Sequence, residues 1–442
     1  MASHGTLTAD PAEYGVMDLK GGETRLDPEI RNNPFPFYRA LRAQDPVYYD
    51  PGLDLYLVTK YADAVQVLGD NDTFSLEHGY QDRYANGFVD EFAEILNRDG
   101  GGFIRDLAID PPAHTRLRRL IEKAFTAHRV KTLEPRIRQI VVDLLEPLAE
   151  RGGGDGIREI GGPLTARIIC EQLGFDWDEV GSDKVNVWTK AVLDQIGRMQ
   201  TREAMLENAA VMCDLQNFII RYIEAREADP REDMISDIVH AELADDANPR
   251  LSRQEQIATI RGFLIAGNDT TAAAIANVLF VLATRPGLAD ELFEQVDNER
   301  TMMRFVEEVL RMYPPVHGLF RTAMKDVELS GTLVPAGAQL CVLYASANDD
   351  DAKFEDPRRL DIERPNVGNN ITFGSGIHKC VGIALARMEI KLVAQEFIRH
   401  FTDIKLTVPP SELTFLPTLA SQTFENLPLT FSQRKAQQED PA

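Results

Sequence analysis

The feature that most constrains the fold of this chain is a helical periodicity that dominates its middle. From about residue 112 to residue 311, apolar residues recur at three- and four-residue spacing, the pattern of amphipathic helices. Strand-like alternation is limited to short pieces, which predict a hairpin over 47–49 and 55–59 and short strands within 327–343 and 415–431. The sequence therefore predicts a mainly α fold with a minor sheet component.

Length and charge narrow the classes of function. The chain has 442 residues, of which 44% are hydrophobic, so a large core can form without disulfides. Its 47 Lys and Arg residues against 70 Asp and Glu residues give a net charge of −23, which repels phosphate backbones. We therefore expect no nucleic-acid partner.

The cysteines and the most apolar stretch bear on the compartment. Cys170, Cys213, Cys341 and Cys380 form no CxxC pair, so neither a zinc cage nor a disulfide framework is indicated. The first 30 residues carry acidic side chains and no continuous apolar run, which argues against a secretory signal. The clearest apolar stretch, 270–284, has 15 residues where a membrane span needs about 20. We expect a cytoplasmic protein that does not enter a membrane.

We predict one domain. The chain shows no internal repeat, and the loops predicted at 151–156 and 225–232 are too short to link domains. Residues 1–25 are predicted to form a flexible arm, and the polar residues 433–442 a disordered tail. Residues 26–432 then form the single folded unit.

One cysteine has an unusual neighbourhood. Gly374, Gly376, His378 and Gly382 all lie within six residues of Cys380, and a helix of about 18 residues is predicted to follow. Glycines allow a tight loop and a close approach of the backbone to a large ligand. A cysteine at the start of a helix meets unpaired N–H groups, which favour the thiolate. This cysteine therefore suits a metal ligand or a nucleophile, whereas packing as a small hydrophobe suffices for the other three.

A second candidate site lies inside a long helix predicted over 252–284. Its run Ala266-Gly-Asn-Asp-Thr-Thr271 places polar residues and a glycine in an otherwise apolar helix, which costs stability unless the groups have partners. Such breaches of local rules are expected at functional sites. The alternative is structural, because a threonine hydroxyl can bond to the carbonyl four residues earlier and bend the helix.

Two further pairs have helical spacing. Glu308 and Arg311 share one helix face, and a proline pair then ends that helix. His114 and Arg118 share another face within the segment 110–140, which holds eight basic and three acidic residues and so has a charge of +5. Each pair also fits an ordinary solvated helix face, and the basic segment fits an anion site or a docking surface for an acidic partner. No GxxxxGK[ST], HExxH or GxSxG motif accompanies them, so nucleotide-binding and hydrolase functions lack support.

In order and spacing, these motifs resemble the haem-thiolate monooxygenases called cytochromes P-450. The run from Phe373 to Gly382 fits FxxGxxxCxG, and the run from Ala266 to Thr271 fits the oxygen-activation motif [AG]Gx[DE]T[TS]. Glu308 and Arg311 fit ExxR, and the segment 354–364 is similar to the one that leads to the cysteine loop. The resemblance covers almost the whole chain and is to the soluble bacterial type. The fold that it implies has a large helical lobe and a small lobe containing β-sheet.

The resemblance implies a role for each motif. Cys380 would be the proximal thiolate ligand of the iron of haem b, donating electron density that favours O–O cleavage. Asp269 and Thr270 would be the acid–alcohol pair that delivers protons to dioxygen, with Gly267 relaxing the helix so that oxygen fits. The other cofactor-binding residues implied are His114, Arg118, Arg321 and His378 at the haem propionates, and Ala266, Phe373, Gly374 and Gly382 along the haem and the cysteine loop.

The resemblance also implies a scaffold, a redox partner and a substrate pocket. Glu308 and Arg311 would pair with Arg364 in a buried structural network. The basic segment would dock an acidic ferredoxin, or a flavodoxin, with its NAD(P)H reductase, and we predict that Arg116 and Lys123 take part. The predicted pocket walls, with one polar member, are Phe88, Phe103, Phe263, Leu264, Val316, His317, Leu319 and Leu419.

The activity implied is the insertion of one oxygen atom from O2 into a hydrophobic small molecule, by hydroxylation or epoxidation, with two electrons from the partner. A peroxide-using peroxygenase or isomerase is one alternative, although the intact Asp269–Thr270 pair argues against it. A non-catalytic haem-binding sensor is the other.

Overall fold

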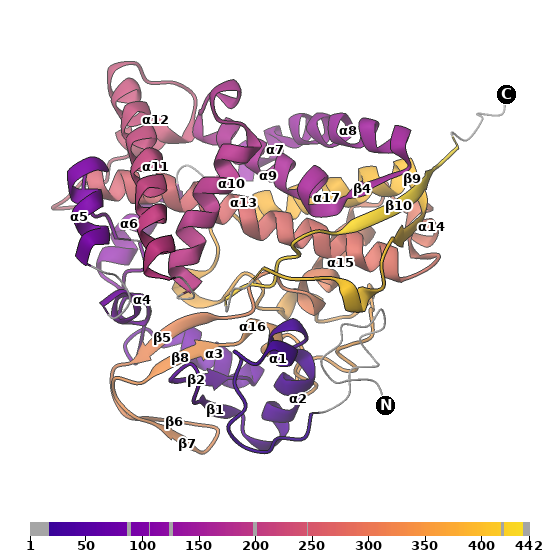
Figure 1. The fold of residues 1–442 in the computed structure, drawn as a ribbon, viewed down its shortest axis with the longest axis horizontal. Helices are drawn as coiled ribbons and strands as arrows, with labels where there is room; N and C mark the ends of the chain where they lie inside the picture. The colour runs from indigo at the N-terminus through magenta and orange to yellow at the C-terminus, as the bar shows by residue number, and fades with distance from the viewer. Residues whose placement is uncertain are drawn as a thin grey trace.

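One helix, α13 (Arg253–Thr284), runs through the middle of the molecule with other helices packed around it (Figure 1). It begins at a capping box, in which the Ser252 hydroxyl accepts from the Glu255 N–H and the Glu255 carboxylate accepts from the Ser252 N–H. Its 32 residues confirm the helix predicted over 252–284. The structure, a computed structural model, describes residues 17–85, 90–105, 107–122, 127–197, 201–244, 246–416 and 420–435.

By length and composition, α13 is also the one helix within these described ranges that could cross a membrane. However, 78% of its most apolar window is buried inside the protein. A core helix has the same length and composition, and the burial of α13 is that of a core helix.

The remaining helices form most of the large lobe and part of a smaller one (Figure 1). Their predominance confirms the predicted mainly α class. In chain order they are α1 (Pro28–Asn32), α2 (Phe35–Gln44), α3 (Tyr61–Gly69), α4 (Leu76–Ala85), α5 (Asp90–Asp99), α6 (Ala113–Ile121), α7 (Ala127–Thr132), α8 (Glu134–Arg151), α9 (Gly162–Leu173), α10 (Trp177–Gly197), α11 (Arg202–Ala228), α12 (Met234–His240), α14 (Leu288–Phe293), α15 (Glu299–Met312), α16 (Tyr344–Ala347) and α17 (Ile383–His400).

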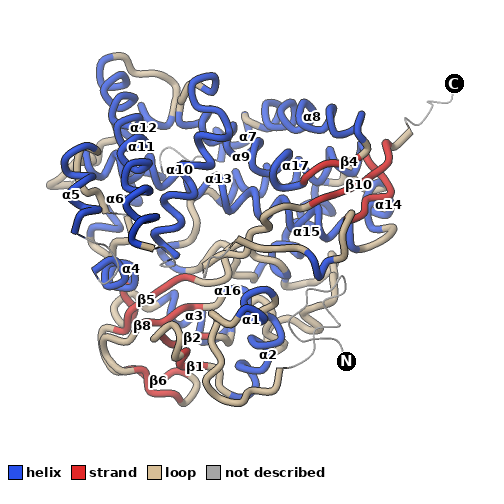
Figure 2. Tube along the Cα trace, viewed as in Figure 1, coloured by secondary structure: helices blue, strands red, loops and turns tan. Residues whose placement is uncertain are grey.

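The strands gather in two places (Figure 2). A five-stranded sheet of order β1-β2-β8-β5-β3, with one parallel pair, lies in the smaller lobe, where β6 and β7 also form a hairpin. A three-stranded sheet, β4-β10-β9, lies at the edge of the helical lobe. Their bounds are β1 (Val47–Asp50), β2 (Leu55–Val58), β3 (Phe74–Ser75), β4 (Gly153–Asp155), β5 (Leu319–Ala323), β6 (Val327–Leu329), β7 (Thr332–Val334), β8 (Gln339–Val342), β9 (Phe401–Leu406) and β10 (Pro428–Gln433).

The predicted hairpin is present, but one predicted loop is not a loop. β1 pairs antiparallel with β2, and Val47 lies opposite Val58. Residues 151–156 instead contain β4, which pairs with β10, and the start of a π-helix at Gly156. The strand forms because its partner arrives from the far end of the chain, which no local pattern reveals.

Two buried clusters of apolar side chains hold the helices together. One joins α9, α10 and α11 to the first half of α13, and Ile169, Trp188 and Leu264 belong to it. The other joins the second half of α13 to α15 and α17, through residues such as Ile275 and Phe397. Because α13 contributes to both clusters, most of its length is buried.

Both ends of the described chain correct the predicted boundaries. Residues 17–25, predicted as part of a flexible arm, pack on the body: Arg25 is 3% exposed, and its Nη1 donates to the Ile30 carbonyl at 3.0 Å. At the other end, β10 continues to Gln433, and Arg434 donates to three backbone carbonyls. These hydrogen bonds extend the packed body beyond 26–432 in both directions. The rest of the predicted arm and tail lies outside the described residues.

Candidate active site

The loop that carries Cys380 is shaped by two glycines. Gly374 and Gly376 have φ of +73° and +69°, a region that residues with a Cβ rarely adopt. A side chain at Gly376 would also collide with the carbonyl oxygen of Leu68. The Cys380 N–H closes the loop by donating to the Phe373 carbonyl at 2.9 Å. The 18-residue helix α17 then follows, as predicted.

The Cys380 thiol differs from the other three thiols, which are buried, because this residue keeps exposed surface. Enough protein surrounds the sulfur that burial raises the pKa of the Cys380 thiol. Two N–H groups at the start of α17, those of Gly382 and Ile383, lower this pKa, and so do the guanidinium groups of Arg118 and Arg387. A sulfur that meets N–H donors and cations is suited to act as a thiolate ligand.

On α13, the residues of the second motif lie where the helix is not fully covered. Ala266 is exposed and Thr270 partly so, although most of the helix is buried. The Thr270 hydroxyl donates to the Ala266 carbonyl at 2.8 Å, which is the contact that the structural alternative requires. Its oxygen keeps lone pairs that can accept a further hydrogen bond. The structural and the functional role of this threonine are therefore compatible.

Asp269 is the acidic member of this motif. Burial alone raises the pKa of its carboxyl from the ordinary 3.8 to about 6. A carboxyl group with such a pKa exchanges its proton readily near neutral pH, as a general acid must.

α13 continues through Gly267, whose role in relaxing the helix stays a prediction. Its missing side chain also lets α9 come close: a Cβ would lie 3.1 Å from Cγ1 and Cδ1 of Ile169. A Cβ at Gly161, just before α9, would likewise lie 2.9 Å from the Ala272 carbonyl oxygen. In this structure, both glycines serve the contact between α13 and its neighbour.

Three side chains assigned to the haem propionates present unsatisfied nitrogens. Within the described ranges, His114 Nδ1, His378 Nε2 and Arg321 Nε are buried and have no hydrogen-bond partner. The two imidazole rings lie 4.1 Å apart between centroids. Burial, His114 and Arg321 lower the pKa of His378 to about 3. Buried nitrogens need partners, and carboxylates would supply them, so these residues fit the haem that the resemblance implies.

Arg118 already has two partners. Its Nε donates to Glu122 at 2.6 Å, and its Nη1 donates to the Lys379 carbonyl at 2.9 Å. Arg118 therefore ties α6 to the cysteine loop, one residue before Cys380. Its contact with a propionate stays a prediction.

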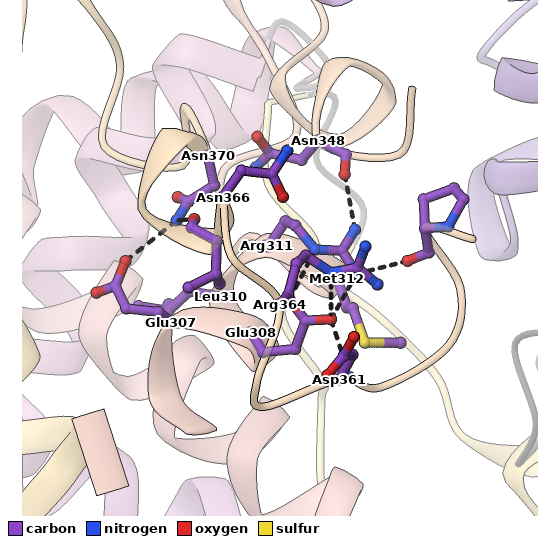
Figure 3. Close-up of polar contacts among 12 residues, drawn as sticks. Glu307, Glu308, Leu310, Arg311, Met312, Asn348, Asp361, Arg364, Asn366 and Asn370 are labelled. Atoms are coloured by element: carbon purple, nitrogen blue, oxygen red, sulfur yellow. Dashed lines mark hydrogen bonds and ion pairs between the residues drawn. The ribbon is translucent and has the colours of Figure 1, made fainter. Parts of the chain in front are cut away.

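The predicted network of Glu308, Arg311 and Arg364 is present (Figure 3). Arg311 donates to both carboxylate oxygens of Glu308 at 2.9 Å, and also to the carbonyls of Asn348 and Pro357. Arg364 donates to Glu308 at 3.0 Å. The three charged side chains are at most 3% exposed. The network fastens α15 to the segment that leads to the cysteine loop, as expected of a scaffold.

Two other groups of ion pairs were not predicted. Asp349 binds Arg42 of α2 at 2.8 Å and also binds Arg358. Glu307 binds Arg387 of α17 at 2.5 and 2.9 Å. The sequence feature that could have identified Glu307 is its position directly before Glu308, the glutamate of the ExxR motif. No local pattern pairs Arg42 with a residue 307 positions away.

Two predicted pocket residues are core residues instead. Leu264 is 0% exposed within the cluster that α9 and α10 form with α13, on a different side of the helix from the exposed Ala266. His317 is 1% exposed, and its ring lies 5.9 Å from that of Phe35 and 6.3 Å from that of Tyr38, both on α2. Of the other predicted residues, Phe103, Phe263, Val316 and Leu319 keep partial exposure, while Phe88 and Leu419 lie outside the described residues.

The basic segment carries less free charge than its sequence suggests. Arg116 donates to Glu255 at 2.7 Å and to two backbone carbonyls, so it joins α6 to the start of α13. Arg136 and Arg138 also bind carboxylates of the protein. The contact of Arg116 with a redox partner stays a prediction. Lys123 lies outside the described residues.

Comparisons with known proteins agree with this site. A family model described as cytochrome P-450 matches residues 199–417. Cytochrome P-450 107B1 of Saccharopolyspora erythraea is 34% identical over 384 residues, covering 86% of this chain and 89% of that protein. Mycinamicin IV hydroxylase/epoxidase of Micromonospora griseorubida is 33% identical over 371 residues, covering 82% and 86%.

A solved structure extends the agreement to the fold. Cytochrome P-450 CREJ in complex with (4-ethylphenyl) dihydrogen phosphate matches with a TM-score of 0.82 at 28% identity, over 90% of this chain and 97% of that one. The predicted fold is thereby confirmed. The chain belongs to the cytochrome P-450 family, and it is a monooxygenase whose haem iron is held by a cysteine thiolate.

Proposed function

We propose that Cys380 is the thiolate ligand and that the enzyme hydroxylates or epoxidises an apolar small molecule. The observation that carries this proposal is the position of Cys380, which is the one exposed cysteine. Its loop, shaped by two glycines, also holds His378. His378 is one of the three residues described above whose buried nitrogen has no hydrogen-bond partner. When bound, the haem supplies the activation of dioxygen, so that one oxygen atom enters the substrate and the other leaves as water with two electrons and two protons.

The protons would be held and moved by residues of the chain. Asp269, whose pKa is about 6, can hold a proton beside Thr270 at physiological pH. The Thr270 hydroxyl already donates to the Ala266 carbonyl, so its oxygen is fixed as an acceptor on the exposed face of α13. This pair would pass protons toward that face.

The proposed substrate is apolar. With His317 assigned to the core, the members of the predicted pocket that keep partial exposure within the described ranges are Phe103, Phe263, Val316 and Leu319. Side chains of this kind bind a ligand mainly by burying its apolar surface. A relative is named a hydroxylase and epoxidase, and both reactions are proposed here.

The proposed electron donor is a ferredoxin, or a flavodoxin, with its NAD(P)H reductase. Ile377 and Lys379 of the cysteine loop and Lys131 of α7 are exposed. Exposed cations fit an acidic partner, so we add Lys379 and Lys131 to the predicted Arg116 and Lys123 as proposed docking residues. The cytoplasmic location stays a prediction.

Carbon monoxide binding tests the ligand assignment. The reduced wild type should give the red-shifted Soret band of a thiolate–haem complex, and Cys380→Ala should lose it. Cys170→Ala, which removes a buried thiol, is the matched control and should keep the band. A band that survives in Cys380→Ala refutes the assignment.

Reconstitution tests the activity. A spin-shift screen of a hydrophobic compound library first identifies a ligand. Product that requires NADH, a ferredoxin system and O2 supports the proposed reaction. Product that forms with peroxide but not with NADH, the ferredoxin system and O2 indicates a peroxygenase, and binding without turnover indicates a sensor.

A further inference from the structure

We propose that Asn268 is a positioning residue for proton delivery: it locks α13 to α9 and α10 and so fixes the directions in which Asp269 and Thr270 point. This inference rests on the proposed function, in which those two residues deliver the protons. Asn268 occupies the variable position of the oxygen-activation motif, so the motif itself assigns it no role.

The Asn268 side chain joins three helices. Its Oδ1 accepts from the Thr165 hydroxyl of α9 at 2.9 Å, and its Nδ2 donates to the Thr189 hydroxyl of α10 at 3.2 Å. The three residues are 3%, 0% and 4% exposed in that order. The amide therefore uses its acceptor on one neighbouring helix and its donor on the other.

We call the two hydrogen bonds of the Asn268 side chain the clamp. Breaking either bond is costly, because both lie in an apolar part of the core. Ile169, Trp188, Leu264 and Ile265 belong to the buried apolar cluster shared by these helices. A polar group left without a partner in such a place costs about 1–3 kcal/mol. Leucine has the same number and branching of side-chain heavy atoms as asparagine but neither donor nor acceptor, and aspartate lacks the donor that the Thr189 contact uses. Asparagine is thus matched to both partners.

Because α13 is a helix, fixing Asn268 also fixes the directions of the neighbouring side chains of the motif. Successive side chains turn by about 100° around a helix, so residues two positions from Asn268 lie on nearly the opposite side. Those residues are Ala266, which is exposed, and Thr270, which is partly exposed. The clamped side is also tightly packed, because a Cβ at Gly267 would lie 3.1 Å from Ile169. A rotation of α13 that redirected Thr270 would have to break both hydrogen bonds of Asn268.

A second buried asparagine on α13 provides a matched control. Asn277 is 6% exposed and donates to the Tyr313 carbonyl, at the end of α15, at 2.8 Å. It anchors the same helix by the same kind of bond, nine residues beyond Asn268. Asn277→Leu should therefore cost stability without redirecting Asp269 and Thr270.

The test compares Asn268→Leu with Asn277→Leu in the reconstituted holoenzyme, using the library compound with the largest spin shift. Coupling is measured as product formed per NADH oxidised. We expect Asn268→Leu to lower coupling by about three- to tenfold, with hydrogen peroxide released in place of product. Asn277→Leu should stay within about twofold of the wild type. Both variants should keep the carbon monoxide band and the spin shift.

Peroxide-driven turnover separates positioning from general damage. Hydrogen peroxide brings the oxygen atom, two electrons and two protons together, so that substrate plus peroxide gives oxygenated product plus water. Asn268→Leu should then retain its rate within about twofold of the wild type, because the delivery of protons to dioxygen is bypassed. An equal loss with peroxide and with NADH would overturn the inference, as would equal coupling in the two leucine variants.

Thr189→Val and Thr165→Ser test the clamp from the other helices. Thr189→Val removes the partner of Nδ2 at constant volume and should lower coupling in the same direction as Asn268→Leu, which keeps the test decisive if that variant does not fold. Thr165→Ser removes a buried methyl but keeps the hydroxyl, so it should lose stability and keep coupling. A wild type that makes no product with NADH and O2 would instead overturn the proposed function, and this inference with it.

Discussion

Two regions of the molecule bury a carboxyl group with opposite effects on its pKa. One is the scaffold around the cysteine loop, which contains Asp349, and the other is the middle of α13, which contains Asp269. Burial would raise the pKa of Asp349, but Arg358 and Arg42 outweigh burial and hold that pKa below its usual value. Burial acts alone on Asp269 and raises its pKa to about 6. A carboxylate locked between two guanidinium groups keeps its charge and serves as structure, whereas one poised near neutral pH can exchange a proton.

The other anchors of the two regions follow the same division. The cysteine-loop scaffold is held by buried charges, such as the pair of Glu308 with Arg311. The middle of α13 is held by neutral hydrogen bonds, such as that of Asn268 with Thr165. Removing one partner of a buried ion pair costs about 3–5 kcal/mol, because the other charge stays buried, whereas losing a neutral bond costs about 1–3 kcal/mol. We therefore expect substitutions in the scaffold to unfold the enzyme and substitutions in α13 to alter its chemistry.

The largest effect should come from Arg311→Leu. This variant leaves the Glu308 carboxylate, which is 0% exposed, without the Arg311 guanidinium. It also removes the donors to the carbonyls of Asn348 and Pro357. The free energy of unfolding in urea should fall by about 3–5 kcal/mol. Arg98→Leu, which removes an arginine from the exposed pair with Asp99, is the control and should leave that free energy unchanged within error. Equal losses in the two variants would contradict the division between buried and exposed charges.

Asp269→Asn should give the next largest effect, and its size depends on pH. Because the folded pKa of about 6 exceeds the ordinary 3.8, the folded state binds this proton more tightly, and it loses stability as pH rises between these values. Above pH 6, the variant should exceed the wild type in unfolding free energy by up to about 3 kcal/mol. Urea titrations from pH 4 to pH 8 measure the difference, which should grow up to pH 6 and then stay level.

Asp349→Asn is the counterpart on the scaffold side. It should be less stable than the wild type at pH 7, because it leaves the buried guanidinium groups of Arg42 and Arg358 without their carboxylate. If both aspartates responded to pH in the same direction, the contrast between the two regions would be refuted.

Local sequence patterns predicted the elements that depend on near neighbours. The helix over 252–284, the hairpin around residue 50 and the helix after Cys380 all follow from periodicity, capping or turn chemistry within a few residues. The triad of Glu308, Arg311 and Arg364 was predicted by resemblance, and the structure confirms its contacts.

What could not be predicted depends on partners that are distant in the chain. β4 forms only because β10 pairs with it, and part of what lowers the pKa of Asp349, besides the nearby Arg358, is Arg42 of the distant α2. Periodicity identified an apolar helix around Leu264, but the neighbouring helices decide which of its sides is covered. His317 is a core residue because the aromatic rings of α2 enclose it.

The smallest effect, and the finest test of how α13 is packed, is expected from Gly267→Ala. Alanine favours the helix by about 1 kcal/mol over glycine, but its Cβ would lie 3.1 Å from Cγ1 and Cδ1 of Ile169, and crowding of this kind costs about 1–3 kcal/mol. The single variant should therefore lose about 1 kcal/mol or less of unfolding free energy. In an Ile169→Val background, which removes Cδ1 but keeps Cγ1, the same change should cost less unfolding free energy. A double-mutant cycle in urea measures this coupling, and additive effects would show that Gly267 is not held by contact with α9.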